Sequence, residues 1–326
     1  MRNNLTAMLI SAILTVICGI IALPLLKKIK AGQPVLEYVK AHEAKNGTPT
    51  MGGLFFIIPA AIVFIAFGGL SKKVSTVALV IGLSYMAVGF LDDFIKIRLR
   101  HNEGLKPYQK IIFQLLIAVF AGVFCYINGI VNFYIPFFNV YFNAGAFTIL
   151  IVALVFLAIT NSVNLTDGLD GLAGGVSFAY LFFMGLLILL QISALNGTGY
   201  TEEYEKLVLL IFTLMGAIGG FLLFNVNKAR VFMGDTGSLS LGGFVGAVSV
   251  FSSNSFFIPI IGIMFVLSSI SVIIQVIHFK RTGKRVFLMS PIHHHYQMKG
   301  YTETQIAYAY VFITCVFGAL SVLAYL

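Results

Sequence analysis

Long apolar runs, separated by short polar segments, fill most of the chain. A helix that crosses a membrane needs about 20 apolar residues, and many of these runs approach that length. Run length rather than periodicity places the elements, because every face of such a helix is apolar. The pattern predicts ten helices, at residues 4–25, 51–68, 74–91, 110–128, 146–162, 172–193, 207–224, 238–255, 257–278 and 304–325.

Composition supports an all-α polytopic membrane protein with about ten transmembrane helices. Hydrophobic residues make up 59% of the 326 residues and charged residues only 10%, and the mean hydropathy is +0.97. A soluble domain cannot cover that much apolar surface with polar residues. Residues 1–326 therefore form one transmembrane domain in this interpretation, and the first run reads as an uncleaved helix.

The net charge of +9 follows the positive-inside rule, by which short cytoplasmic loops carry the Lys and Arg residues. The loops after the odd-numbered predicted helices hold 17 of the 21 Lys and Arg residues, and the opposite side holds only Arg2, Lys72, Lys73 and Lys206. The sequence thus predicts that odd-numbered helices end in the cytoplasm and that both termini lie outside. The positive charge gives no reason to expect a nucleic-acid partner.

All five aspartates fall at the predicted cytoplasmic ends of the third, fifth and seventh helices. Asp92 and Asp93 lie in LDDFIK, where adjacent carboxylates point in different directions on a helix and can serve two roles. Asn164, Asp167 and Asp170 are spaced by three, so that on a helical turn they would share a face. The competing interpretations are a solvated helix end for the first pair and simple helix capping for the second group.

Two further segments carry candidate chemistry near the same surface. Asp235 lies in the turn GDTGS before the eighth helix, where Thr236 or Ser238 could be plain N-caps. His293, His294 and His295 are consecutive and cannot easily all reach one zinc ion, so phosphate binding or substrate orientation is the preferred role. At least one of the three is also compatible with an ordinary surface position.

The segment HEAKNGTPTMGG precedes the second helix. Lys45 and Thr50 are candidate phosphate contacts there, and the alternative for Lys45 is a positive-inside lysine in a cytoplasmic turn. Carboxylates gathered nearby repel each other and take up protons unless cations neutralise them. Carboxylate oxygens suit Mg²⁺, which binds a few carboxylates together with substrate phosphates. The sequence therefore predicts phosphoryl chemistry on a lipid at the cytoplasmic face.

Four segments, in this order and spacing, resemble the polyprenyl-phosphate N-acetylhexosamine-1-phosphate transferases: LDDFIK, NLTDGLDGLA, FMGDTGSL and PIHHH. The resemblance covers essentially the whole chain, and GTPTMGG and PIHHH favour the branch that uses UDP-N-acetylmuramoyl-pentapeptide. It implies that undecaprenyl phosphate attacks the β-phosphate of that nucleotide, so that UMP leaves and lipid I of peptidoglycan synthesis forms. It also implies Mg²⁺ as cofactor, a bacterial plasma membrane and, as a family expectation, a homodimer.

The resemblance assigns roles to matching positions. Asp235 is the implied Mg²⁺ ligand, Asp92 beside Asp93 is the group that deprotonates or positions the lipid phosphate, and His293 is implied to bind substrate phosphate or sugar. The nucleotide-side residues implied by the resemblance are Asn164, Asp167, Asp170, Asn225 and Phe232, with Phe232 stacking on uracil. Further implied substrate contacts are Lys45, Thr50, Lys96, Lys110, Gln275, His294 and His295.

Three other functions stay open on the sequence. The first is a sibling transferase that uses UDP-N-acetylglucosamine, against which the three histidines argue. The second is an ion-coupled transporter or lipid flippase, although transporters place ionisable residues near the bilayer midplane and these aspartates lie at helix ends. The third is a non-catalytic scaffold, against which the intact motifs argue.

Overall fold

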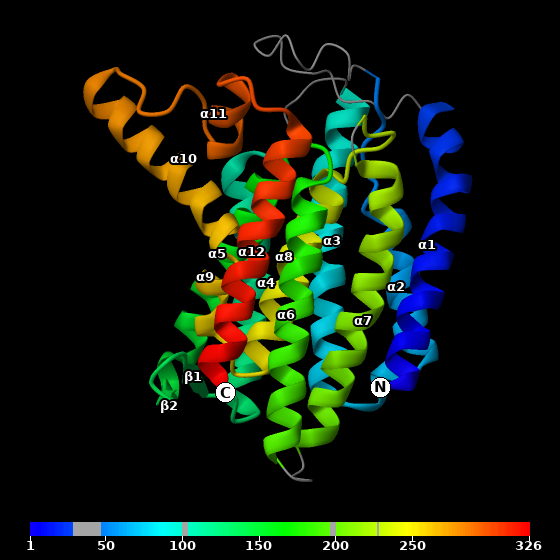
Figure 1. Cartoon of the computed structure of the whole chain (residues 1–326), viewed down its shortest axis with the longest axis vertical. Helices are drawn as coiled ribbons and strands as arrows, with labels where there is room; N and C mark the ends of the chain where they lie inside the picture. The colour runs from blue at the N-terminus through cyan, green and yellow to red at the C-terminus, as the bar shows by residue number, and fades with distance from the viewer. Residues whose placement is uncertain (29–46, 100–103, 196–199, 227) are drawn as a thin grey trace.

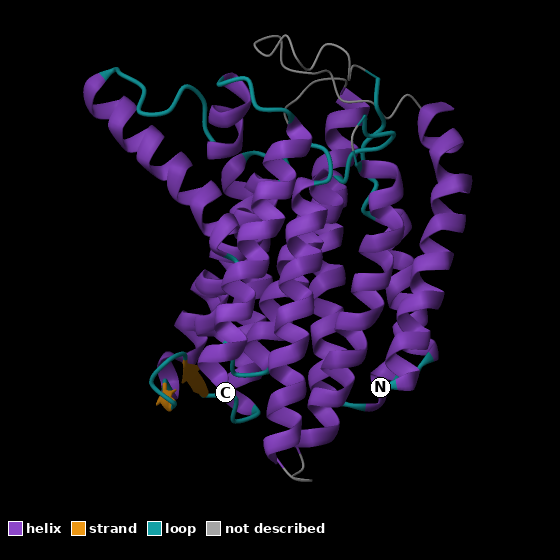
Figure 2. Ribbon diagram, in the orientation of Figure 1, coloured by secondary structure: helices purple, strands orange, loops and turns teal. Residues whose placement is uncertain are grey.

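The computed structural model describes residues 1–28, 47–99, 104–195, 200–226 and 228–326. It is a bundle of long helices with one small hairpin (Figures 1 and 2). The first helices are α1 (Arg2–Lys28), α2 (Leu54–Ala66), α3 (Lys73–Leu99), α4 (Pro107–Ile127), α5 (Thr148–Thr166) and α6 (Leu172–Leu195). The remaining helices are α7 (Tyr200–Asn225), α8 (Gly234–Phe251), α9 (Ile258–Ile261), α10 (Ile263–Thr282), α11 (Ile292–Met298) and α12 (Glu303–Tyr325).

Each of the ten predicted helices has a counterpart, but the predicted helix at 257–278 is two helices. The chain breaks at Gly262, between α9 and α10, and Pro259 lies in the first turn of α9, where a helix tolerates proline. Beyond the break, α10 leans away from the bundle (Figure 1). The short helix α11 and the hairpin of β1 (Asn132–Ile135) and β2 (Val140–Asn143) were not predicted.

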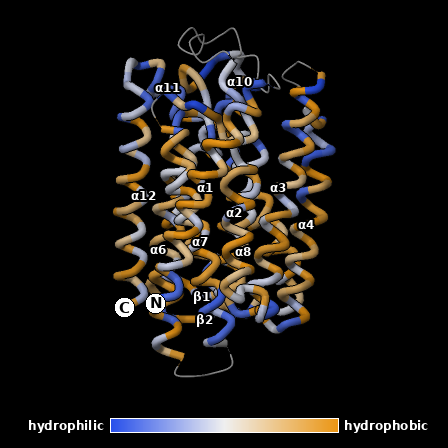
Figure 3. The backbone as a smooth tube through the Cα atoms, turned by 90° about the vertical axis from the view of Figure 1, so that its right-hand side faces the viewer, coloured by the Kyte–Doolittle hydropathy of each residue, from blue (hydrophilic) through white to orange (hydrophobic). Residues whose placement is uncertain are grey.

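Within the described ranges, eight helices are long and apolar enough to cross a membrane: α1, α3, α4, α5 with the turn before it, α6, α7, α10 and α12. The two remaining helices that were predicted to cross the membrane, α2 and α8, do not meet this criterion. α2 has only 13 residues, and α8 is rich in Gly and Ser and is almost wholly enclosed. Figure 3 shows a broad hydrophobic band along the bundle with more hydrophilic segments at both ends. The chain is therefore a polytopic helical membrane protein.

Small residues bring the backbones of α3, α5 and α8 together. A Cβ added to Gly89 in α3 would lie 2.0 Å from the carbonyl oxygen of Asp235 in α8, and one added to Gly242 would lie 2.5 Å from the Cα of Thr160 in α5. Small residues allow such close approach of membrane helices. Because Gly89 precedes Asp93 by one helical turn, this contact sets the acidic end of α3 against the first turn of α8.

The two ends of the bundle differ. Both termini and the hairpin lie at one end, and α11 lies at the other (Figure 1). Among the described residues, the last turns of α1, α3 and α10 lie towards the α11 end and carry Lys27, Lys28, Lys96, Arg98, Lys280 and Arg281. The five aspartates also belong to that end, since they lie late in α3, just after α5 and at the start of α8.

Candidate functional site

Asp93 closes the N-terminus of α8. The side chain is fully buried, and its two oxygens accept hydrogen bonds from the backbone amide of Asp235 at 3.2 Å and from that of Thr236 at 2.9 Å. The Thr236 hydroxyl donates a third bond at 2.7 Å. The first amides of a helix need acceptors, and here a side chain of another helix supplies them. Asp93 is therefore a capping residue across two helices.

Asp235 is held by two lysines and an asparagine. Its Oδ2 accepts hydrogen bonds from Lys96 Nζ and Lys110 Nζ, both at 2.9 Å. Its Oδ1 accepts one from Asn164 Nδ2 at 2.6 Å, and the same amide also donates to Ser238 at 2.8 Å. The structure thus joins α3, α4, α5 and α8 at one carboxylate, as the predicted site requires.

Asp92 completes the acidic group. It is buried, and its Oδ1 accepts a hydrogen bond from the backbone amide of Leu105 at 2.9 Å. Its Oδ2 forms an ion pair with Lys96. Oxygens of Asp92, Asp93 and Asp235 all lie within 4.8 Å of one another. The Leu105 contact was not predicted, because a backbone amide leaves no signal in residue type.

Asp167 faces the same acidic group from the end of α5. It is the C-cap residue of that helix and is half-buried. Burial raises the pKa of Asp167, and the charges of Asp235, Asp93 and Asp170 raise it further. A cation or a cationic substrate group next to Asp167 would relieve that cost.

Asp170 and Asn225 connect two loops. The amide of Ala229 donates to Asp170 Oδ2 at 2.9 Å. Asn225 accepts a bond from the Gly171 amide at 3.1 Å and donates to the Val231 carbonyl at 3.0 Å. The prediction that Asp167 and Asp170 share a face of one helical turn is wrong, because α5 ends at Thr166 and a non-helical turn separates them.

Thr50 and Phe232 lie where the segment before α2 meets the segment before α8. The Phe232 amide donates to the Pro49 carbonyl at 2.8 Å, and the Gly52 amide donates to the Phe232 carbonyl at 2.9 Å. The Thr50 hydroxyl is buried and has no hydrogen-bond partner among the described residues. The Phe232 side chain is half-buried. Lys45 lies outside the described residues.

The three histidines differ in their surroundings. His293 is fully buried, and neither ring nitrogen has a hydrogen-bond partner among the described residues. A Cβ on Gly168 would lie 2.3 Å from His293 Nε2, so the ring faces the turn that follows Asp167. Burial lowers the pKa of His293 well below its usual value, and His294 lowers it further. The ring is therefore neutral at pH 7.

His295 and Gln275 bind the same loop instead of the acidic group. His295 Nδ1 accepts a hydrogen bond from the Leu288 amide at 3.1 Å. Gln275 accepts bonds from the Val286 and Phe287 amides at 3.0 and 2.9 Å and donates to the Phe287 carbonyl. Gln275 was predicted to face the site, and its hydrogen bonds instead anchor the loop between α10 and α11. His294 contacts Gln297 through Nδ1 at 3.0 Å.

Comparison with known proteins places the chain in a family. The model of glycosyl transferase family 4 matches residues 75–253, and signature 1 of the phospho-N-acetylmuramoyl-pentapeptide-transferases matches residues 45–57. A phospho-N-acetylmuramoyl-pentapeptide-transferase of Clostridium perfringens (strain 13 / Type A) is 42% identical over 312 residues, 95% of each chain. The chain belongs to the phospho-N-acetylmuramoyl-pentapeptide-transferase family.

Other family members are similar over the same length. The phospho-N-acetylmuramoyl-pentapeptide-transferase of Clostridioides difficile (strain 630) is 42% identical over 323 residues, which is 97% of this chain and 96% of the relative. That of Listeria monocytogenes serotype 4b (strain CLIP80459) is 39% identical over 319 residues, 96% of this chain and 95% of the relative. The glycosyl transferase match includes Asp92, Asp93, Asn164, Asp167 and Asp235, so the acidic group lies inside the family's shared region.

Proposed function

We propose that the chain transfers phospho-N-acetylmuramoyl-pentapeptide from UDP-N-acetylmuramoyl-pentapeptide to undecaprenyl phosphate. The products are lipid I, for peptidoglycan synthesis, and UMP. One observation carries the proposal: in a chain that belongs to this family, three carboxylates and two lysines from different helices meet at Asp235. That arrangement suits phosphoryl transfer, where positioning and charge stabilisation supply most of the rate.

The three carboxylates fit a Mg²⁺ ion, but they would not all be its ligands. Asp93 already binds the first amides of α8 through both oxygens. Asp92 Oδ2 and Asp235 Oδ2 instead contact lysine side chains, which can turn away from a carboxylate, and ligand oxygens of the two residues lie within 4.8 Å of each other. Asp235 and Asp92 would therefore hold Mg²⁺, and Asp93 would position Asp235. When bound, the ion supplies positive charge against the negative charge that develops on phosphate oxygens.

The lysines and Asp92 suit a direct attack. Lys96 and Lys110 can turn from Asp235 to phosphate oxygens of either substrate, since their flexible side chains carry compact charges. Asp92 would position the lipid phosphate, which is already an anion, so that one of its oxygens forms a bond to the β-phosphorus while the bond to the UMP oxygen breaks. No covalent enzyme intermediate is needed. Ping-pong kinetics would contradict this route.

The nucleotide would lie on the side of Asn164, Asp167 and Phe232. Phe232 is proposed to stack on uracil, and the neutral ring of His293 to bind phosphate or sugar as a hydrogen-bonding group. Thr50 has a buried hydroxyl without a partner, which supports a phosphate contact. Lys45, Asp170, Asn225, Gln275, His294 and His295 keep their proposed substrate roles only through the resemblance. Lys45 lies outside the described residues, and the other five bind loops or a neighbouring side chain.

The same proposal includes the membrane topology. Ten spans, counting α2 and α8, place both termini outside and the acidic group at the cytoplasmic face of the bacterial plasma membrane. The distribution of Lys and Arg residues supports it. The whole chain would act as one domain, and dimer formation remains a prediction from the family resemblance.

The test uses purified protein in detergent with undecaprenyl phosphate, Mg²⁺ and UDP-N-acetylmuramoyl-pentapeptide, and follows UMP release. UDP-N-acetylglucosamine, omission of the metal and Asp235→Ala are the comparisons. Glu205→Gln, an exposed carboxylate at the other end of the bundle, is the matched control. We expect release with the muramoyl substrate alone, lost without Mg²⁺ and in Asp235→Ala. Release with only the N-acetylglucosamine nucleotide, or with neither from folded protein, would overturn the proposal.

A further inference from the structure

The hairpin between α4 and α5 has two chemically different faces. β1 and β2 are antiparallel, and Phe133 pairs with Phe142 while Tyr134 pairs with Tyr141. Side chains alternate across a strand, so paired positions share a face. One face carries Asn132, Tyr134, Tyr141 and Asn143, and the other carries Phe133, Ile135, Val140 and Phe142. A hydrogen bond between Asn143 and Asn132 at 2.8 Å is consistent with the first face.

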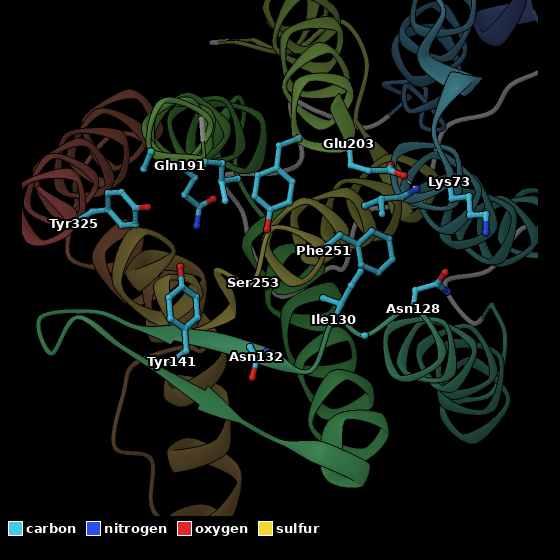
Figure 4. Close-up of a pocket in the computed structure, with 15 residues that line it drawn as sticks. Lys73, Asn128, Ile130, Asn132, Tyr141, Gln191, Glu203, Phe251, Ser253 and Tyr325 are labelled. Carbon is cyan, nitrogen blue, oxygen red and sulfur yellow. Dashed lines mark hydrogen bonds between the residues drawn. The ribbon is translucent and has the colours of Figure 1, made fainter. Parts of the chain in front are cut away.

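The polar face lies over a cavity at the end of the bundle that holds both termini. The cavity has a volume of about 520 Å³ and is lined by Asn132 and Tyr141 of the hairpin together with the ends of several helices. Figure 4 shows Tyr141 rising from the hairpin towards the cavity, with Gln191 and Tyr325 opposite. This side of the hairpin therefore meets protein and polar groups.

The strand β2 and the tip of the hairpin are uncovered. Phe137 and Phe138 at the tip are 63% and 74% exposed, and Val140 and Phe142 in β2 are 49% and 42% exposed. Neighbouring apolar side chains of this size are rarely left in water. In β1, by contrast, Phe133 is fully buried, so the hairpin is fastened to the bundle by one strand and presents the other outward.

The uncovered surface continues onto a membrane helix. The chain leaves β2 and enters the span Gly145–Thr166, where Phe147, Leu150 and Leu154 are 71%, 57% and 57% exposed. These positions recur at helical spacing and form one lipid-facing stripe. The exposed aromatic residues of the hairpin are thus continuous in the chain with the outward surface of a helix long and apolar enough to cross a membrane.

We propose that this hairpin lies in the lipid–water interface of the membrane instead of extending into the aqueous phase. Phe137 and Phe138 insert among the upper acyl chains, and the Asn and Tyr face covers the cavity. Tyr is enriched at the headgroup level of a bilayer, which suits the exposed Tyr141, and the exposed Phe137 and Phe138 at the tip suit the apolar region next to it. The occupant of the surface formed by the tip and β2 is lipid, and the inference holds whichever reaction the opposite end performs.

The absence of tryptophan from the chain allows a direct measurement of depth. Phe138→Trp and Phe137→Trp would each carry a single tryptophan, and Glu202→Trp, an exposed position at the same end, is the matched control. Each variant is placed in phosphatidylcholine vesicles with lipid brominated near the top of the acyl chains, or near their ends, and is titrated with aqueous iodide. Circular dichroism verifies the fold of each variant.

We expect the two hairpin tryptophans to show blue-shifted emission, loss of emission with lipid brominated near the top of the chains, and protection from iodide. Glu202→Trp should show the opposite pattern. Quenching of the hairpin tryptophans by iodide, as in the control, would overturn the proposal in favour of an aqueous hairpin. Protection from both quenchers that disappears on dilution of the protein in lipid would overturn it in favour of a second copy of the chain.

Discussion

Asp93 in α3 accepts hydrogen bonds from both the backbone amide and the hydroxyl of Thr236 in α8. The neighbouring Asp92 instead meets the Leu105 amide and Lys96. Two adjacent carboxylates therefore hold different positions in the site. One fixes the helix that carries Asp235, and the other pairs with a lysine side chain that can turn to a ligand.

Because the two carboxylates differ in this way, we expect Asp93→Asn and Asp92→Asn to differ in thermal stability. Asp93→Asn replaces one of the two acceptor oxygens by an NH2 donor opposite a buried amide, and leaving such a group unpaired costs about 1–3 kcal/mol. We expect a lower Tm by circular dichroism together with lost UMP release. Asp92→Asn should lose UMP release with a smaller change in Tm. Equal thermal losses in the two variants would contradict the separate roles.

The two lysines that share Asp235 Oδ2 are expected to matter for the reaction more than for the fold. Lys110→Gln removes a cation from a site where phosphate charge must be stabilised, and we expect kcat to fall by about 10²–10³-fold, as when one charge-stabilising donor is removed. Lys280→Gln removes an exposed cation at the end of α10 and controls for net charge. A Lys110→Gln variant as active as Lys280→Gln would exclude Lys110 from phosphate binding.

Asp167→Asn is expected to stabilise the protein without ligands while weakening nucleotide use. The raised pKa of Asp167 means that the folded state holds the proton more tightly than the unfolded state. Ionisation above the unfolded pKa, about 4, therefore costs folding free energy, and this cost grows until the pH reaches the folded pKa. The neutral amide avoids it, and Tm should rise by about 2–4 °C for each kcal/mol recovered.

The measurements for Asp167→Asn are Tm against pH and KM for the nucleotide. The wild type should lose stability relative to the variant as the pH rises above about 4, and the variant should have the higher KM. A variant with lower Tm than the wild type at neutral pH would show that the Asp167 carboxylate makes a stabilising contact in the folded protein.

The lowered pKa of His293 predicts that the folded protein loses stability in acid. Its lowered folded pKa means that the unfolded state binds the proton more readily. The stability linked to the neutral ring is complete above the unfolded pKa of about 6.5, and it is lost as the pH falls from there towards the folded pKa. His293→Gln cannot take up a proton, so its Tm should fall less than that of the wild type between neutral and mildly acidic pH. Parallel Tm profiles would show that His293 does not titrate on unfolding.

Much of the fold follows from run length alone. An apolar stretch that long satisfies its backbone hydrogen bonds inside a helix wherever it lies, so all ten predicted helices have counterparts. The hairpin and α11 escaped prediction because both are short and depend on packing against helix ends. The sequence predicted one helix at 257–278, and only the packed bundle shows the break at Gly262 after which α10 leaves it.

The candidate site, like the fold, was predicted only in part from the sequence. The sequence by itself determined that acidic groups gather at one end of the membrane helices, because residue type and position along an apolar run suffice for that. Only the tertiary structure decided that Asp93 caps α8, that Asp235 holds two lysines, and that Gln275 binds a loop. Those roles depend on which backbone amides and side chains lie within hydrogen-bonding distance, and close packing at Gly89 and Gly242, distant in the chain, sets that geometry.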